Sequence, residues 1–384
     1  MTASSAGRGA EMNVYLDNGA TTKADDAVVR EMSTALSVDY GNPSSLHVLG
    51  RNASEIIDKA RSAIAKELNC APDEIIFTSG GTEANNLALN ILSQGDHLIT
   101  SVIEHPSVLG KAGELEKKGV KVTYLKVDNK GFISPGELKK AINDKTRLVS
   151  IMHANNEIGV VQNITEIGDI CRAKNVFFHS DCVQSFKKEL IDVNKMNLSM
   201  ASLSAHKIHG PKGAGALFVR KGVRINPLFF GGAQESKRRS GSENVPGIAG
   251  FGKAVSLKFD SEKIRVLRDY FIARVEKEIE NVKLNGSREK RLCNNVNFSF
   301  AGIEGESLLM HLDLNGICVS TGSACSSRSL EPSHVLMALG LKHEVAHGSI
   351  RFTLSKYTSK EELDYVVVKL KEAVKRLREV SALR

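Results

Sequence analysis

The sequence predicts an α/β fold with a mostly parallel seven-stranded sheet, followed by a smaller α+β domain. From Tyr15 to about residue 251, short apolar runs alternate with amphipathic stretches. A strand–helix–strand repeat of this kind builds a parallel sheet covered on both faces. After Phe251 the pattern changes to long charged helices and separate strands. We therefore divide the 384 residues into an N-terminal extension (1–14), expected to be flexible, a large domain (15–255) and a small domain (256–384).

Each expected element is defined by its length and periodicity. The strands of the large domain are Glu74–Thr78, His97–Thr100, Lys121–Lys126, Arg147–Met152, Val176–His179, Met200–Ser204 and Ala214–Val219. Its helices include Ser54–Leu68, Thr82–Leu92, Ser107–Lys118, Pro135–Ala141 and Ile164–Ala173. In the small domain we expect helices over 261–279 and 306–314, strands over 295–300 and 349–354, and a final helix opened by a capping box of Ser359 and Glu362. Loops that follow parallel strands meet at one sheet edge, where ligands bind.

The composition limits the class of partner. No apolar run approaches the roughly 18–20 residues needed to span a bilayer, so we expect no membrane segment. The net charge of +8 favours anionic cofactors or acidic partners, but no basic block is interleaved with aromatic residues, and we expect no nucleic-acid binding. The six cysteines are scattered without a CxxC pair. This argues against a disulfide scaffold or a closed zinc site and predicts a reducing cytoplasm.

A glycine-rich turn is the first candidate site. Residues 79–86, SGGTEANN, directly follow a predicted strand and open a predicted helix. The free N–H groups and the positive end of the dipole at a helix start bind phosphate. Gly81 lets the backbone approach closely, and Thr82 adds a hydroxyl donor. The alternative is the N-cap of a purely structural helix.

A lysine in the segment SAHKIHGPKG, residues 204–213, is the second candidate. Lys207 follows a strand and lies beside a hydroxyl (Ser204), an imidazole (His206) and a glycine-rich turn. This arrangement is suited to a Schiff base near a phosphate, which predicts that Lys207 carries pyridoxal 5′-phosphate (PLP). The alternative is a basic surface loop with solvated lysines.

Further polar groups follow other strands. Asp181 is placed to pair with a protonated pyridine nitrogen, and Gln184, one turn on, to donate to the phenolic oxygen of the ring. His105, at the head of a helix, is suited to stack on a planar ring and to move protons. Asn156 is placed to reach the cofactor or the substrate. Alone, Asp181 could be a helix cap and His105 a structural histidine, but together these groups predict a PLP site.

A thiol-bearing stretch indicates the reaction. Residues 320–329, STGSACSSRS, are small and polar, and such a loop can expose Cys325 as a nucleophile. Arg351, in a predicted strand, offers a bidentate fork for a substrate carboxylate. The alternative for Arg351 is an interdomain salt bridge.

With these motifs the sequence resembles the cysteine desulfurases of the NifS/IscS-like group, among the class V aminotransferase-like PLP enzymes. The resemblance runs from YLDNGATT at residue 15 to the final helix and includes GNPSSLH (41–47), HANNEIG (153–159) and RSGSEN (239–244). It implies the fold type I of PLP-dependent transferases and a homodimer with the active site at the subunit interface. The implied reaction converts L-cysteine to L-alanine and transfers the sulfur to Cys325 as a persulfide. The implied acceptor is an iron–sulfur scaffold protein, with tRNA thiolation as a second use.

The resemblance also implies roles for single residues. Lys207 holds the cofactor and carries the Cα proton, His105 stacks on the ring and Asp181 holds the pyridine nitrogen. The other implied cofactor contacts are Gly81, Thr82, Asn156, Gln184, Ser204, His206 and, from the second subunit, Ser242. Arg351 and Asn42 are implied contacts of the substrate carboxylate. No resident metal is implied, and Cys325 is a candidate ligand of a transient iron–sulfur cluster.

Two residues depart from the family pattern. Cys182, beside Asp181, is a candidate second thiol near the cofactor, and Arg328 puts a charge into the cysteine loop. One alternative function is a selenocysteine lyase or an aminotransferase on the same fold, which would not need Cys325. A non-catalytic scaffold that only retains the fold is the other.

Overall fold

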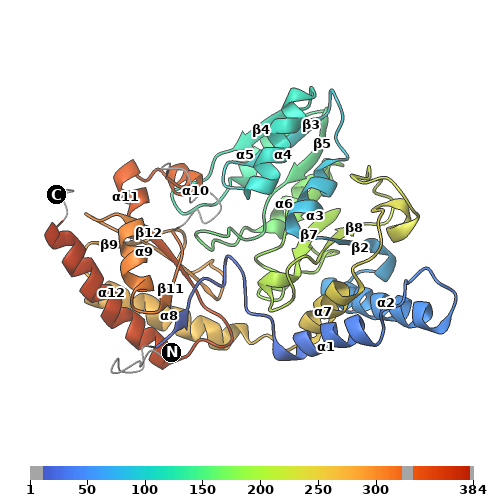
Figure 1. Ribbon diagram of the computed structural model, residues 1–384. Helices are drawn as coiled ribbons and strands as arrows, with labels where there is room; N and C mark the ends of the chain where they lie inside the picture. Colours follow the sequence, from blue (N-terminus) through green and yellow to red (C-terminus); the bar gives the residue numbers. More distant parts are fainter. Residues whose placement is uncertain (1–11, 322–331, 381–384) are drawn as a thin grey trace. The chain divides into compact units, whose positions relative to one another are not determined.

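The computed structural model describes residues 12–321 and 332–380, which form two compact units (Figure 1). The larger unit comprises Thr21–Asn156 and Val160–Phe259. The smaller unit contains the described residues from Asp260 onward, together with those up to Ala20 and Glu157–Gly159. The expected boundaries, 15–255 and 256–384, differ from this division mainly at the start of the chain, where the first described residues pair with the C-terminal part.

A seven-stranded sheet forms the centre of the larger unit, in the order β2-β8-β7-β6-β5-β3-β4. Only β8 runs antiparallel to its neighbours, and the other pairs are parallel. The expected sheet is confirmed, and each predicted strand agrees with the observed one to within two residues. The strands are Ile75–Thr78 (β2), His97–Ser101 (β3), Lys121–Leu125 (β4), Thr146–Ser150 (β5), Phe177–Asp181 (β6), Met200–Ser204 (β7) and Gly215–Val219 (β8).

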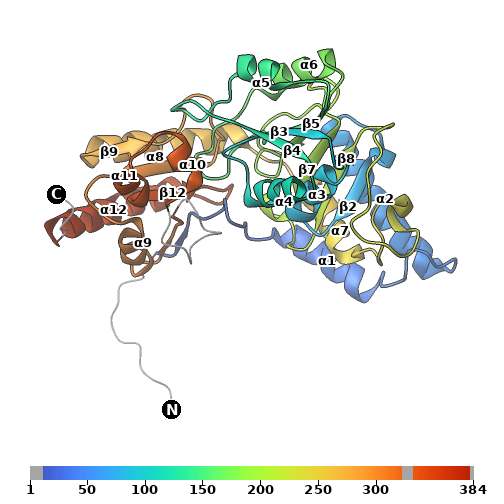
Figure 2. The same ribbon diagram turned by 90° about the horizontal axis from the view of Figure 1, so that it is seen from above.

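Helices cover both faces of this sheet (Figures 1 and 2). Successive strand residues enter different cores: Leu98 packs with one apolar cluster and Ile99 with another, because side chains alternate across a strand. One face is covered by α3 (Gly81–Leu89) and α4 (Pro106–Lys117). The opposite face is covered by α1 (Asp26–Ser37), α2 (Val48–Leu68), α5 (Pro135–Ala141), α6 (Ile164–Ala173) and α7 (Val245–Ser256).

Helix α7 was not predicted, because it lacks a polar face. Nine of its twelve residues are buried, and a helix that is apolar all round gives no amphipathic signal. Its glycines bring neighbouring helices close. A Cβ on Gly252 would lie 2.6 Å from Cβ of Ala60 in α2, and a Cβ on Gly250 2.7 Å from Cγ of Met32 in α1.

The smaller unit contains the antiparallel sheet β12-β10-β9 and the parallel pair β1-β11. Val14, which was assigned to the N-terminal extension (1–14), pairs with Ile317 and is part of this unit. The strands are Val14–Tyr15 (β1), Val282–Leu284 (β9), Asn295–Phe300 (β10), Ile317–Cys318 (β11) and Ser349–Thr353 (β12). The helices are Ser261–Glu278 (α8), Gly305–Asp313 (α9), His334–Ala338 (α10), His343–His347 (α11) and Lys360–Val380 (α12).

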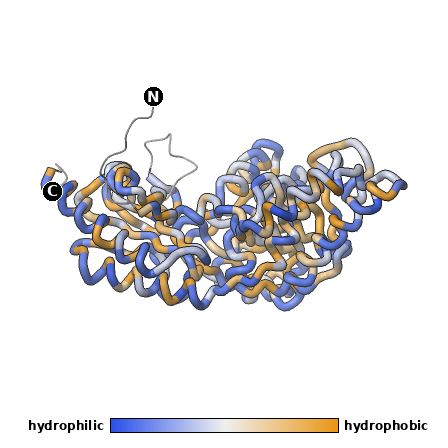
Figure 3. Tube along the Cα trace, turned by 60° about the horizontal axis from the view of Figure 1, so that its bottom comes forward, coloured by the Kyte–Doolittle hydropathy of each residue, from blue (hydrophilic) through white to orange (hydrophobic). Residues whose placement is uncertain are grey.

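Hydrophilic and hydrophobic residues alternate along the helices (Figure 3), as amphipathic packing requires. Within residues 12–321 and 332–380, no helix combines the length and the apolar character needed to cross a membrane.

The predicted capping box opens α12. The Ser359 N–H donates to the Glu362 carboxylate at 2.8 Å, and the Glu362 N–H donates to Ser359 Oγ at 3.1 Å. We expect Ser359→Ala to lower the free energy of unfolding by about 1 kcal/mol, because the helix loses a partner for one of its first N–H groups. Denaturant unfolding measures this, with Lys375→Ala on the exposed side of α12 as the control. An unchanged midpoint in Ser359→Ala would contradict the prediction.

Candidate active site

Three segments distant in sequence meet at one edge of the large sheet. The end of β6 contacts the start of α3, since a Cβ on Gly81 would lie 2.6 Å from Cγ2 of Val183. The end of β7 adjoins the same turn, where a Cβ on Gly80 would lie 3.9 Å from Ser204 Oγ. This convergence was expected, because parallel strands end at a common edge.

The start of α3 has the properties of an anion cradle. Its N-cap residue, Gly80, has φ of 155° and no side chain caps the helix, so the first turn presents N–H groups and the positive end of the dipole. Ser204 Oγ is buried and has no hydrogen-bond partner within the described residues. A buried hydroxyl without a partner is costly unless a ligand satisfies it. The phosphate of PLP, with its acceptor oxygens, fits this turn.

Lys207 lies in a short 3-10 turn, Ala205–Lys207, directly after β7. Its neighbour His206 lies with Nδ1 3.1 Å from Thr21 Oγ1. Burial, together with the charges of Lys207, Lys212 and Lys188, lowers the pKa of His206 to about 3. The imidazole is therefore neutral at neutral pH, and the positive charge that favours an anion comes from the lysines.

Asp181 ends β6 and is held at both carboxylate oxygens. Its Oδ1 accepts the N–H of Val183 at 2.9 Å, and its Oδ2 accepts Nδ2 of Asn85 at 2.7 Å. These two hydrogen bonds, one from the backbone and one from α3, fix the position of the Asp181 carboxylate at the end of β6. Gln184 is buried in the following turn, where its backbone carbonyl oxygen accepts a hydrogen bond from Nζ of the buried Lys188 at 2.8 Å.

His105 is the N-cap of α4, and its Nδ1 accepts the N–H of Ser107 at 3.1 Å. The preceding Glu104 is fully buried, and it accepts hydrogen bonds from Ser101 Oγ and from the N–H of Met152. Burial raises the pKa of Glu104 to about 8. His105 therefore has a structural role, because its ring caps α4. The ring is only half-buried, so this role leaves part of it accessible to a ligand.

Three other predicted contacts lie on loops of the larger unit. Asn156 is half-buried in the turn after β5. Asn42 is exposed, and its Oδ1 accepts the N–H of Ser44 at 2.9 Å, so its side chain shapes a turn. Ser242 is exposed in the irregular segment before α7. Within the described chain, neither Asn42 nor Ser242 shares a hydrogen bond with the residues of the sheet edge.

Arg351 belongs to β12 of the smaller unit and is 2% exposed. Its Nη2 donates to Asp17 Oδ1 at 2.9 Å. The salt bridge named as the alternative role of Arg351 is therefore present. With the boundaries predicted from the sequence it would join two domains, whereas in the observed division both residues belong to the smaller unit. Burial raises the pKa of the nearby Glu157 to about 7 against the opposing effects of Ser333 and the Arg351 charge. Cys325 and Arg328 lie outside the described residues.

Cys182 does not have the properties of a reactive thiol. Its side chain is fully buried, and burial raises its pKa to about 12. At neutral pH it is therefore a thiol and not the nucleophilic thiolate. In the described part of the chain no group of three His, Cys, Asp or Glu side chains could hold a metal ion.

Sequence reasoning assigned no role to Asn85, Ser107 or Lys188, which bond to or lie near the predicted residues. The only sequence signal was their position inside the motifs, and polar residues there are also typical of helix starts and surface loops.

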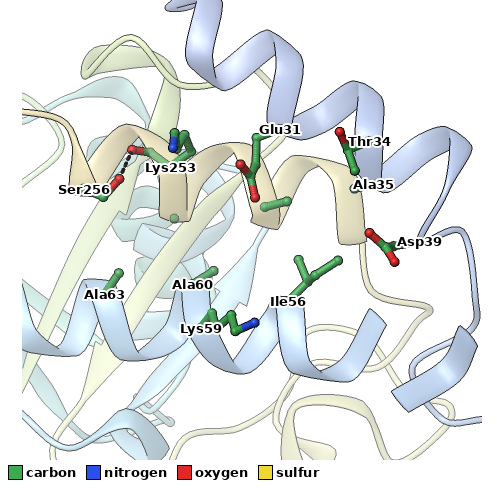
Figure 4. A pocket seen from close by; sticks show the side chains of 12 residues that line it. Glu31, Thr34, Ala35, Asp39, Ile56, Lys59, Ala60, Ala63, Lys253 and Ser256 are labelled. Atoms are coloured by element: carbon green, nitrogen blue, oxygen red, sulfur yellow. Dashed lines mark hydrogen bonds between the residues drawn. The ribbon is translucent and has the colours of Figure 1, made fainter. Parts of the chain in front are cut away.

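A groove of about 420 Å³ lies elsewhere in the larger unit, between α1, α2 and α7 (Figure 4). Charged side chains such as Glu31, Lys59 and Lys253 line it, and none of the predicted site residues does.

The sheet and the lysine-bearing turn define a PLP-dependent transferase of fold type I. A family model described as "Aminotransferase class-V" matches residues 14–366, and the chain belongs to this family. Within it, the chain is 50% identical to a protein named cysteine desulfurase IscS from Dictyoglomus turgidum, over 96% of both chains. Enzymes of this family depend on PLP.

Two solved structures resemble the chain closely. A NifS-like protein superposes with a TM-score of 0.88 at 38% identity, covering 95% of this chain and all of that one. A structure titled "SspA in complex with cysteine" superposes with a TM-score of 0.82 at 37% identity, covering 90% of this chain and all of that one.

The unpaired hydroxyl at the anion cradle gives a direct test of cofactor binding. We expect Ser204→Ala to raise the dissociation constant of PLP by about tenfold or more, because a hydrogen bond to a charged phosphate is lost. Fluorescence titration of the apo-protein with PLP measures this. Ser202→Ala is the matched control, since Ser202 lies two residues earlier in β7 and its Oγ bonds with His179 instead. Equal affinities in the two variants would contradict the prediction.

Proposed function

We propose that the chain is a PLP-dependent cysteine desulfurase that converts L-cysteine to L-alanine and transfers the sulfur to Cys325 as a persulfide. The observation that carries the proposal is the meeting of Asp181, Ser204 and the start of α3 at one sheet edge, next to the turn that bears Lys207. It is supported by the relative from D. turgidum, whose name states this activity.

The described residues divide the work of holding the cofactor. Lys207 forms the covalent link, and Thr82 in the first turn of α3, Ser204 and His206 bind the phosphate. Asp181 pairs with the pyridine nitrogen and His105 packs on the ring. Bound PLP supplies an electron-accepting ring that stabilises negative charge at the substrate Cα.

The remaining residues act on the substrate. Arg351 binds its carboxylate through the guanidinium fork, and the Lys207 amine carries the Cα proton. The Cys325 thiolate forms a bond to the substrate sulfur as the Cβ–S bond breaks. The bonding electrons remain on Cβ, which takes a proton, and alanine leaves while Cys325 retains the sulfur.

The same proposal includes the biological setting. We propose a homodimer in which the exposed Ser242 contributes to the site of the second subunit, and sulfur delivery to an iron–sulfur scaffold protein, with tRNA thiolation as a second use. Cys70, Cys171, Cys182 and Cys318 form no disulfide, which agrees with a reducing cytoplasm.

The role of Cys325 is tested by Cys325→Ala. We expect this variant to keep the visible absorbance of the Lys207-bound cofactor but to lose sulfide and alanine production from L-cysteine, because no thiol accepts the sulfur. Cys318→Ala removes an exposed thiol of the described residues and is the control, with full activity expected. Mass spectrometry after incubation with L-cysteine should find the additional sulfur on Cys325.

Each alternative function predicts a different outcome. Unchanged sulfide production in Cys325→Ala would favour a selenocysteine lyase or an aminotransferase. A colourless protein in which borohydride leaves Lys207 unmodified would favour a non-catalytic scaffold.

Substrate binding by Arg351 is tested by Arg351→Lys. We expect the KM for L-cysteine to rise about tenfold with a smaller change in kcat, because a lysine replaces the two-pronged contact by a point charge. PLP absorbance should be unchanged. A fall in kcat at constant KM would contradict a role in binding the carboxylate.

A further inference from the structure

A chain of hydrogen bonds runs from Asp181 to His105 through two side chains. Asn85 Nδ2 lies 2.7 Å from Asp181 Oδ2 and 2.8 Å from Ser107 Oγ. The Ser107 hydroxyl lies 2.8 Å from His105 Nδ1. The chain therefore joins the end of β6, helix α3 and the first turn of α4, all within the larger unit.

The Asp181 carboxylate sets the direction of the hydrogen bonds that Asn85 makes in this chain of hydrogen bonds. Asp181 accepts the backbone N–H of Val183 at its other oxygen, so it is an acceptor throughout, and Asn85 must turn its NH₂ group toward it. The second N–H of Asn85 then points to Ser107 Oγ. That oxygen keeps a second acceptor site, so the direction of its bond with His105 Nδ1 depends on whether Nδ1 carries a hydrogen.

The backbone N–H of Ser107 donates to the same His105 nitrogen, at 3.1 Å. A ring nitrogen that accepts this hydrogen carries none of its own, so the Ser107 hydroxyl donates its hydrogen toward the same Nδ1. In the neutral imidazole the remaining hydrogen lies on Nε2, because one ring nitrogen donates and the other accepts.

Burial gives this chain its strength. Asn85 is 1% exposed and Ser107 is 9% exposed, so their hydrogen bonds act at low dielectric constant. The Oδ1 atom of Asn85 is buried without a hydrogen-bond partner among the described residues, which is unfavourable. An asparagine that served only packing would not need to leave its Oδ1 atom without a partner. Asn85 keeps this orientation because its NH₂ group donates one hydrogen to Asp181 and the other to Ser107.

We propose that Asn85 and Ser107 are positioning residues that hold His105 as the Nε2–H tautomer and couple its ring to the Asp181 carboxylate. The functional importance of this arrangement rests on the proposed function, since Asp181 and His105 are the residues assigned to the PLP ring. It specifies that His105, while neutral, presents a hydrogen on Nε2 and donates through that atom.

The tautomer is tested by ¹⁵N magic-angle-spinning NMR of the crystalline protein labelled with ¹⁵N-histidine, with and without PLP. The His105 signals are assigned by their loss in His105→Gln. We expect an unprotonated Nδ1 and a protonated Nε2 for His105. In Ser107→Ala and Asn85→Ala we expect the Nδ1 signal to move in the same direction, toward a less strongly hydrogen-bonded nitrogen.

Kinetics provide a second measurement. We expect Ser107→Ala to lower kcat about tenfold with little change in KM, as for the loss of about one hydrogen bond. Ser107→Thr keeps the hydroxyl and should restore both kcat and the Nδ1 signal. Ser134→Ala removes the N-cap hydroxyl of α5, which accepts the N–H of Glu137, and should change neither. If Asn85→Ala does not fold, the Ala and Thr variants of Ser107 decide the question.

A protonated Nδ1 on His105 would overturn the proposal, as would an Nδ1 signal that Ser107→Ala leaves in place. The NMR measurement needs no turnover of cysteine. A protein that shows the expected tautomer but releases no alanine would therefore contradict the desulfurase assignment and leave the hydrogen-bond chain intact.

Discussion

The hydrogen bond between Asp181 and Asn85 is the interaction on which the site depends. It joins the end of a central strand, β6, to α3, the helix whose first turn forms the anion cradle. The cradle and the carboxylate must be held at a fixed separation if they are to bind the two ends of one rigid cofactor. A short bond to a buried carboxylate fixes that separation better than apolar packing, because its geometry is directional.

Burial keeps two titratable side chains near this hydrogen bond uncharged. It lowers the pKa of His179 to about 3 and raises that of Glu104 to about 8, so both side chains are mainly neutral near pH 7. The charge at the sheet edge is therefore carried by Asp181 and the lysines. This separation of a negative and a positive region corresponds to a ligand with a basic nitrogen at one end and a phosphate at the other.

The sequence was sufficient for the strands and for the motifs, because both are local. A short apolar run identified the strand Met200–Ser204, and its position before a lysine indicated the site. Helix α7 has no polar face and gave no signal. The contacts between Asn85 and Asp181, 96 residues apart, and between Arg351 and Asp17, 334 residues apart, depend on tertiary structure. No local sequence pattern predicts which side chains form these long-range hydrogen bonds.

The pairing of β1 with β11 has a consequence for synthesis on the ribosome. Val14 and Tyr15 emerge early, but their partners, Ile317 and Cys318, are translated some three hundred residues later. The larger unit, which ends at Phe259, has its whole sequence available before this pairing is possible. The ion pair between Asp17 and Arg351 likewise cannot form until most of the chain has been translated, so the smaller unit is completed last.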